Sequence, residues 1–426
     1  MASVYGSLAQ GGHTSPIASF ALLNQIYFAL ISTAAVATAT LPFLRDSVLS
    51  YGKLDAPATP SSFSSTSTST STTKKSKKEQ VSPHDSWIKT IKSLQVPKAW
   101  FSHFYVFATL WMIYMVIDLW VYSSSAVVLP PTTISFSTRI TVIRSMPAIL
   151  TSTQKYWSLL TFLNYLGIMP AHIPLTLAQS ATEPLIFRSW VPPPHVLLTM
   201  TCYLFQLVRR WYESWFVERP SVDAKMNVAL YILGITFYSA MAPTTWIDAY
   251  EAWLRQGGAL GPVDATTPSQ LNSMLFGLSG QCLLGLILFV WGSWHQYNCH
   301  VILANLRPKP SDSGDRSKEK PAYRVPFGDW FQYMVAPHYS AEMVIYLGLY
   351  LMGSSSPLAA NSSTAPTLLC AWIWVVINLG IVARETDQWY RVRFGDRYAA
   401  IGAPAGTKAG RSGRTPRRYI LIPFIY

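Results

Sequence analysis

Long apolar runs recur along the whole chain and are separated by short polar segments. Five of these runs contain no Asp, Glu, Lys or Arg: 16–44, 156–182, 189–208, 226–247 and 265–294. Three further runs are shorter or interrupted: 101–122, 330–352 and 366–383. Because about 20 apolar residues suffice for a helix to cross a bilayer, the pattern predicts an all-α, polytopic membrane protein. We expect a helical bundle of roughly six to eight segments.

The composition agrees with this prediction, because 50% of the 426 residues are hydrophobic and only 12% are charged. A net charge of +13 would suit a nucleic-acid partner, but the basic residues lie in loops beside the apolar runs. That placement is typical of the cytosolic side of a membrane protein. We therefore expect a membrane and no nucleic acid, with the basic segments 74–78, 307–324 and 391–418, and hence the C-terminus, in the cytosol.

The basic segments conflict with the number of apolar runs between them. Five runs lie between 74–78 and 307–324, and an odd number of crossings would place these two segments on opposite sides of the membrane. Either one of the five runs is re-entrant or interfacial, or one basic segment is not cytosolic. The sequence leaves both alternatives open.

A stretch rich in Ser and Thr, 59–79, ends in a basic cluster and cannot form a hydrophobic core. We expect it to be disordered and to belong to a cytosolic linker at 51–95. This linker divides the chain into an N-terminal membrane segment at 1–50 and a single membrane domain at 96–426.

Polar side chains gather at the ends of several apolar runs, where a bilayer makes them costly and therefore candidates for function. The clearest group is HQYNCHVILANLR (295–307), which follows directly on an apolar run. On a helix, its Gln296, His300 and Arg307 share one face. The alternative for Arg307 is a helix end whose side chain simply reaches the headgroups.

Three more polar clusters lie at run ends: RRWYES (209–214), PHYSAE (337–342) and RETDQWY (384–390). Arg209 and Glu213 have the i,i+4 spacing of a helical ion pair, and Glu342 can accept a hydrogen bond from His338 four residues earlier. Structural pairing is the alternative for both pairs. The histidines and cysteines match no metal motif and no GxGxxG follows a strand, so we expect no metal and no Rossmann domain.

Four pieces of the chain resemble the polyprenol reductase branch of the steroid 5-alpha-reductase family. They are VPKAWFSHFYVFATLW (96–111), HQYNCHVILANLR (295–307), RVPFGDWFQYMVAPHYSAEM (324–343) and YILIPFIY (419–426). The resemblance runs from about residue 96 to the end. The first 95 residues and the hydrophilic insertions at 309–322 and 401–416 lie outside it.

The resemblance implies a multi-pass enzyme of the endoplasmic reticulum membrane that uses NADPH to saturate the α-isoprene unit of a polyprenyl lipid. This step leads to dolichol, the lipid carrier for protein N-glycosylation. The family holds NADPH at the cytosolic ends of the C-terminal helices and their loops. The cofactor contacts that it implies here are Gln296, His300, Arg307, Tyr323, His338, Glu342 and Tyr390. Steroid-reducing members have Asp and Asn at the positions of His300 and His338, which makes those two contacts less secure.

Elementary chemistry adds to this expectation. Arginines pair bidentately with phosphates, so Arg307 and Arg324 suit the pyrophosphate or the 2′-phosphate. A hydride adds readily to a conjugated aldehyde, whose carbonyl oxygen takes up the charge, but not to an isolated C=C bond. We therefore expect polyprenal as the substrate and partner dehydrogenases that handle polyprenol and dolichal. A hydrogen-bond donor must stabilise the oxygen; the candidates are His295 first, then Tyr212 and Glu213.

Other enzyme classes remain open. A 3-oxo-5-alpha-steroid 4-dehydrogenase and a very-long-chain enoyl-CoA reductase share the C-terminal pattern, but the segment 96–111 favours the polyprenol branch. An isoprenylcysteine carboxyl methyltransferase-like enzyme would carry His-Pro-x-Tyr, whereas this chain has Pro337-His338-Tyr339. A lipid-binding scaffold without activity would have no affinity for a nucleotide.

Overall fold

The structure is a computed structural model. It describes residues 20–41, 44–45, 93–124, 126–129, 185–188, 192–219, 224–255, 278–307, 324–355, 365–395 and 418–421. For residues 120–124, 126–129, 185–188 and 253–255 only the backbone is described. Residues 51–92 of the expected linker at 51–95, the apolar run 156–182, the insertions 309–322 and 401–416, and Tyr323 lie outside these residues.

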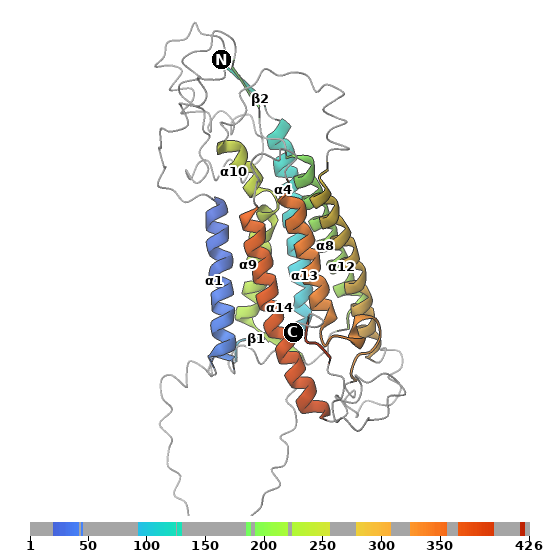
Figure 1. Cartoon of the computed structure of the whole chain (residues 1–426). Coiled ribbons are helices and arrows are strands. Elements are labelled where there is room, and N and C mark those ends of the chain that lie inside the picture. Colours follow the sequence, from blue (N-terminus) through green and yellow to red (C-terminus); the bar gives the residue numbers. More distant parts are fainter. Residues whose placement is uncertain are drawn as a thin grey trace, which may run out of the picture.

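Seven long helices of the described part stand side by side in a bundle (Figure 1). They are α1 (Phe20–Thr40), α4 (Phe101–Ser124), α8 (Pro194–Tyr212), α9 (Val228–Thr244), α12 (Gly280–Asn305), α13 (Pro337–Gly353) and α14 (Pro366–Phe394). A shorter helix, α10 (Ile247–Arg255), lies at one end of the bundle. The prediction of an all-α helical bundle is therefore confirmed.

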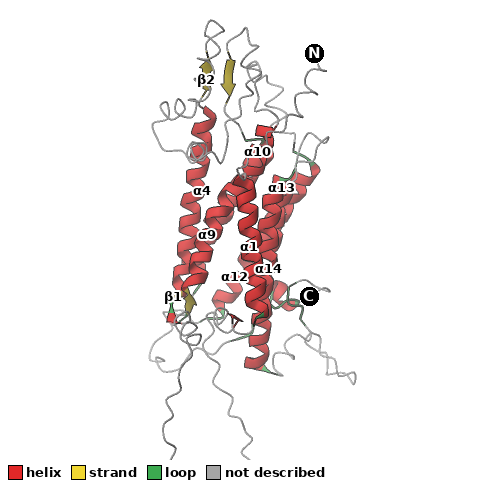
Figure 2. Ribbon diagram, turned by 90° about the vertical axis from the view of Figure 1, so that its left-hand side faces the viewer, coloured by secondary structure: helices red, strands yellow, loops and turns green. Residues whose placement is uncertain are grey.

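Short elements close the two ends of the bundle (Figure 2). The strands are β1 (Gln95–Pro97), β2 (Ala126–Leu129), β3 (Leu185–Arg188) and β4 (Lys225–Asn227), and they pair as β1 with β4 and β2 with β3. Two 3-10 turns, η2 (Lys98–Trp100) and η5 (Asp329–Gln332), and one π-helical turn, η3 (Glu213–Val217), complete the described elements.

Three helical stretches are long and apolar enough to cross a membrane by length and composition: Phe20–Thr40, Lys98–Leu119 and Pro366–Phe394. Helix α9 is apolar but shorter. Helices α8 and α12 are less uniformly apolar because they carry buried polar side chains such as Gln206 and Gln296. The chain is a polytopic helical membrane protein, and α8 and α12 bury polar side chains inside the bundle.

The strand pairs explain the conflict over crossing parity. Antiparallel pairing of β1 with β4 brings the starts of α4 and α9 to the same end of the bundle, which we call the basic end. Four described helices, α4, α8, α9 and α12, run between β1 and Arg307, so the chain returns to the basic end. The pairing of β2 with β3 brings the chain just after α4 next to the segment that precedes α8.

Three helix bounds differ from the apolar runs. Helix α12 continues to Asn305, beyond the run that ends at 294, and α14 continues to Phe394, beyond 383. Figure 1 shows α14 extending past the other helices at the basic end, where polar residues meet water. Helix α13 begins at Pro337 rather than 330, because proline has no N–H to donate and is well accommodated in the first helical turn.

Helices α12 and α13 approach each other through facing glycines. A Cβ at Gly285 would lie 2.7 Å from the carbonyl oxygen of Gly348, and a Cβ at Gly348 would lie 2.6 Å from the carbonyl oxygen of Gly285. Small residues allow such close backbone contact between membrane helices. This contact sets the spacing of the two helices whose basic ends carry Gln296 and Glu342.

The N-terminal helix is joined to the rest of the bundle at both ends. The Ala21 backbone N–H donates to Glu251 Oε1 of α10 over 2.9 Å. Beyond the other end of α1, Arg45 forms a 2.9 Å ion pair with Glu385 of α14. The residues between include Phe28, which is fully buried. Helix α1, which the family resemblance does not cover, therefore packs within the same membrane bundle.

Gly348→Ala should lower the unfolding temperature by several degrees, because overpacking a tight contact costs about 1–3 kcal/mol. Thermal unfolding of the detergent-solubilised protein measures this. Gly280→Ala is the matched control, since a Cβ there meets nothing within 4 Å. Equal unfolding temperatures for the two variants would contradict the close approach of α12 and α13.

Candidate active site at the basic end of the bundle

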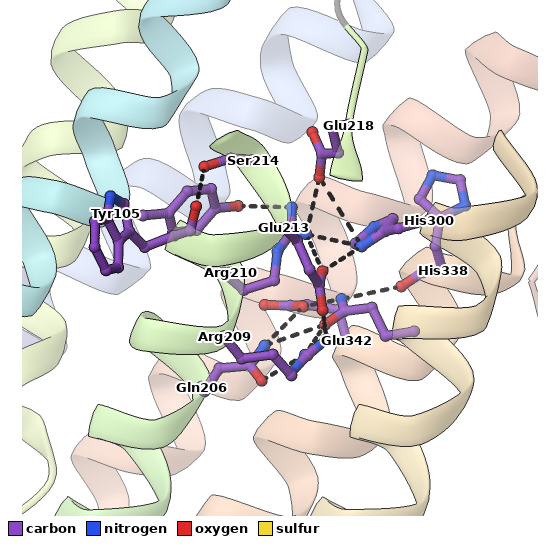
Figure 3. A network of polar contacts seen from close by, with 12 residues as sticks. Tyr105, Gln206, Arg209, Arg210, Glu213, Ser214, Glu218, His300, His338 and Glu342 are labelled. Atoms are coloured by element: carbon purple, nitrogen blue, oxygen red, sulfur yellow. Dashed lines mark hydrogen bonds and ion pairs between the residues drawn. The ribbon is translucent and has the colours of Figure 1, made fainter. Parts of the chain in front are cut away.

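A buried polar network joins four helices near the basic end (Figure 3). Its members come from segments far apart in the sequence. They are Tyr105 of α4; Gln206, Arg209 and Arg210 of α8; Glu213 and Glu218 just after α8; Gln296 and His300 of α12; and His338 and Glu342 of α13. We call this set the buried polar network.

Its inner part is built from amides around one carboxylate. Glu342 Oε2 accepts a hydrogen bond from Gln206 Nε2 over 3.2 Å and another from Gln296 Nε2. The two glutamines are also bonded to each other, because Gln206 Nε2 donates to Gln296 Oε1 over 3.2 Å. Arg209 donates to Gln206 Oε1 over 2.7 Å, to Gln296 Oε1 and to Glu213. The expected i,i+4 pair of Arg209 and Glu213 is thus confirmed.

Its outer part is an ion cluster around Arg210. One nitrogen, Nη1, lies 2.5 Å from Glu213 Oε2, 2.9 Å from Glu218 Oε1 and 2.7 Å from His300 Nδ1. The other, Nη2, donates to the Tyr105 hydroxyl over 3.1 Å. Burial alone would raise the pKa of the Glu218 carboxyl, but the nearby Arg210 and His300 outweigh burial and hold this pKa below its ordinary value.

A π-helical turn begins at Glu213. Residues 213–217 form this turn directly after α8, and single π turns occur frequently at functional sites. The turn leaves Glu213 at 0% exposure while Trp215 is 57% and Phe216 is 68% exposed. Both aromatic side chains are thus available to the membrane interface, where such residues are enriched.

Glu213, Glu218 and His300 bring one ligand atom each to within 4.8 Å of one another, which is close enough for a metal ion. The sequence spacing did not show this group, because two of its members follow α8 and the third lies on α12. A fourth residue, Arg210, occupies the space between these three side chains, and its Nη1 contacts all of them. The group is therefore an ion cluster completed by a guanidinium.

Four of the expected cofactor contacts converge in the network: Gln296, His300, His338 and Glu342. The predicted bond between His338 and Glu342 is replaced by bonds from the two glutamines to Glu342. The His338 backbone carbonyl accepts from Gln296 Nε2 over 3.4 Å. His338 Nδ1 is buried and makes no hydrogen bond in the described part of the chain.

The remaining expected contacts lie outside the network. Arg307 is exposed at the end of α12, and its backbone carbonyl accepts from Arg219 Nη1 over 3.3 Å. Arg324 is exposed at the start of the segment that leads to α13. Tyr390 is half-buried on the extension of α14, with its ring 5.4 Å from Trp389.

The three expected donors occupy different environments. His295 Nδ1 is 3.0 Å from Asp329 Oδ1, and its ring stacks on Trp330 with centroids 4.2 Å apart. Tyr212 is 50% exposed at the end of α8. Glu213 is fully buried and is bonded to Arg209, Arg210 and His300, so its carboxylate acts as an acceptor in this arrangement.

Sequence reasoning missed three network members, Tyr105, Gln206 and Glu218, and did not select Arg210 from the polar cluster RRWYES. Gln206 did give a signal, because it is a polar residue within the apolar run 189–208, and such residues are commonly functional. Arg210 was visible within RRWYES but could not be separated there from the ion pair beside it. Tyr105 and Glu218 gave no signal, because only the tertiary arrangement brings them to Arg210.

Part of the chain matches a known protein family. Residues 272–401, which include α12, α13 and α14, match a family model described as 3-oxo-5-alpha-steroid 4-dehydrogenase. This C-terminal region is therefore a domain of the steroid 5-alpha-reductase family, and the resemblance seen in the sequence is confirmed. Arg209, Arg210, Glu213 and Glu218 lie outside the matched residues and complete the network from α8.

Relatives point to one branch of that family. The chain is 33% identical to "Polyprenal reductase 1" of Oryza sativa subsp. indica over 221 residues, 48% of this chain and 57% of that protein. It is 30% identical to "Polyprenal reductase" of Mus musculus over 259 residues, 61% of this chain and 64% of that protein. A Xenopus laevis protein of the same name is 43% identical over 154 residues, 36% of this chain and 43% of that protein. The chain thus spans less than two thirds of the length of these relatives.

Glu213→Gln should destabilise the protein by about 3–5 kcal/mol, because removing one partner leaves buried charge uncompensated. Glu218→Gln is the matched comparison. Its side chain is 32% exposed, against 0% for Glu213, so its loss should cost clearly less. Thermal unfolding in detergent ranks the two variants, and the reverse order would show that Glu213 is not the central anion of the cluster.

Proposed function

We propose that this protein is an NADPH-dependent oxidoreductase that acts on a CH–CH double bond and saturates the α-isoprene unit of polyprenal, on the route from polyprenol to dolichol. One observation carries the proposal: a buried network of amides, carboxylates and arginines lies within an apolar helical bundle, partly on a domain of the steroid 5-alpha-reductase family. Such an arrangement suits a polar cofactor that meets a hydrocarbon substrate. The names of the relatives support polyprenal as that substrate.

The residues at the basic end fit a reduced dinucleotide. His338 Nδ1 is a buried polar atom without a hydrogen bond in the described part, and the Glu342 carboxylate can accept from a carboxamide. Arg307 and Arg324 are exposed at the same end, where they can bind phosphates. Gln296 and His300 are polar members of the network, and the ring of Tyr390 can stack on the adenine or the nicotinamide. Tyr323 is a further expected contact that lies outside the described residues. NADPH would supply the hydride.

The bundle suits a substrate that stays in the bilayer. A polyprenyl chain is nearly all hydrocarbon, and the apolar helices let it remain in lipid while its head group reaches the network. Addition of hydride at the β-carbon of the conjugated aldehyde moves charge to the carbonyl oxygen, so a donor near that oxygen lowers the barrier. Of the three expected donors, Tyr212 is the candidate for this role, because its hydroxyl can donate and is half-exposed at the end of α8, whereas the Glu213 carboxylate accepts from Arg209 and Arg210 and His295 Nδ1 is bonded to Asp329.

The charge pattern supports a location. Basic segments favour the cytosolic side, which supports a cytosolic position for the basic end and the C-terminus. The endoplasmic reticulum membrane is part of the same proposal, because it is the location that the family resemblance implies for this step. Dehydrogenases that oxidise polyprenol and reduce dolichal would act before and after this enzyme. The dolichol so formed would serve protein N-glycosylation.

Purified protein with NADPH should saturate polyprenal and leave polyprenol unchanged, as read by the mass of the products. The alcohol has no conjugated carbonyl to take up the charge. A steroid enone and a trans-2-enoyl-CoA, supplied in parallel, test the two nearest alternatives. Saturation of polyprenol without any aldehyde would overturn the mechanism, and preference for the steroid or the thioester would overturn the substrate class.

Arg307→Ala should weaken NADPH binding roughly tenfold, because a charge-assisted bond to phosphate is lost. Arg393→Ala is the matched control, since it removes the same charge from an exposed position near the end of α14. Fluorescence titration of NADPH measures both. If the two variants bind NADPH alike, Arg307 does not contact the phosphates.

A further inference from the structure

The segment 324–336 links the basic end to α13, and we call it the connecting segment. On one side it is held by residues 418–421: Val335 N–H donates to the Tyr419 carbonyl over 2.8 Å, and Tyr419 N–H donates to the Tyr333 carbonyl over 2.9 Å. Arg418 Nη1 donates to the Pro326 carbonyl over 3.2 Å. On the other side the connecting segment packs against α12.

The contact with α12 is centred on one polar pair. His295 Nδ1 lies 3.0 Å and 3.1 Å from the two oxygens of Asp329. An ionised carboxylate only accepts hydrogen bonds, so Nδ1 carries the proton in this pair. The ring of His295 stacks on Trp330 at 4.2 Å, and the Trp291 ring packs edge-on against Trp330 at 5.0 Å. Both members of the pair are largely buried, with side-chain exposures of 19% and 18%.

The backbone at this pair is strained. Gly328 has φ 101° and Asp329 has φ 44°, and Asp329 is the only non-glycine residue with positive φ in the described part. Positive φ disfavours a side-chain-bearing residue, although Asp tolerates it better than most. Such strain persists where surrounding contacts determine the conformation, and it gathers at ligand clamps. Here the bond to His295 and the stacked Trp330 are those contacts.

Phe331, two residues after Asp329, connects the strained turn to the buried polar network. Trp330 turns toward His295, whereas Phe331 is 1% exposed and its ring lies 6.1 Å from that of His338. His338 in turn lies 5.8 Å from the His300 ring. Movement of the turn would therefore shift Phe331 against His338, and would also shift Arg324 at the other end of the connecting segment.

We propose that His295 and Asp329 form a latch that positions the connecting segment, and through it Arg324 and His338, for binding of the dinucleotide. The proposal rests on the proposed use of NADPH and gives His295 a positioning role through Asp329. A proton donor at His295 would behave differently: its loss would lower kcat and leave NADPH binding unchanged.

Two variants break the latch with little other change. His295→Phe keeps a ring on Trp330 but removes Nδ1, and Asp329→Gly removes the carboxylate while accepting the positive φ. Each should raise KM for NADPH roughly tenfold, as expected for one lost hydrogen bond to a charged group. The double variant should be no worse than either single variant, because both remove the same interaction. With saturating NADPH, kcat should stay close to that of the unaltered protein.

Asp329→Asn provides the conservative rescue, since Asn keeps an acceptor oxygen and tolerates the same φ; its KM should lie near that of the unaltered protein. Gly280→Ala on the same helix serves as the control. Unchanged KM with a lower unfolding temperature would reduce the pair to a structural contact, and loss of kcat in His295→Phe alone would assign His295 to the reacting atoms. Both outcomes overturn the latch. Absence of NADPH binding by the unaltered protein would instead overturn the proposed function.

Discussion

The organisation of the basic end depends on the need to compensate charge that is buried within a membrane protein. Arg210 is 6% and Glu213 is 0% exposed, and neither could be removed from water alone without a large cost. Glu213 and Glu218 compensate the charge of the guanidinium, and His300 and the Tyr105 hydroxyl lie within hydrogen-bonding distance of its two terminal nitrogens. Glu213 follows Arg209 by four residues and Arg210 by three, so one helical turn brings its carboxylate to the side of both guanidinium groups.

A second constraint comes from the backbone. The glycine contact between α12 and α13 holds these helices close along their length, and at their basic ends Gln296 and Glu342 meet. Helix α8 packs against this pair and adds Gln206 and Arg209. The helix pair therefore supplies the rigid part of the site, while the ion cluster from α8 supplies its charge. The connecting segment and residues 418–421 lie at the same end. The arginines expected to bind phosphates, Arg307 and Arg324, are exposed there, whereas the amides of Gln206 and Gln296 lie inside the network.

Much of the site was visible in the sequence, and what was missed has a physical reason. Gln296, His300, His338 and Glu342 were found because polar residues that end apolar runs on two helices are costly and conspicuous. The bond between His338 and Glu342 was not found in the structure, because two amides from α8 and α12 reach Glu342 instead. Arg210 was hidden among neighbouring charges. Local spacing cannot show that both adjacent arginines, Arg209 and Arg210, contact Glu213 from within the bundle.

Composition and periodicity by themselves determined that the chain forms a polytopic helical bundle, because only helices satisfy the backbone polar groups of long apolar runs within lipid. They also located the basic end and the polar helix termini. Tertiary structure alone decided which of these groups meet: the pairing of β1 with β4 and of β2 with β3, the π turn at Glu213 and the Asp329 turn against His295. These contacts join segments separated by tens to hundreds of residues, and their geometry depends on how whole helices pack rather than on any local pattern.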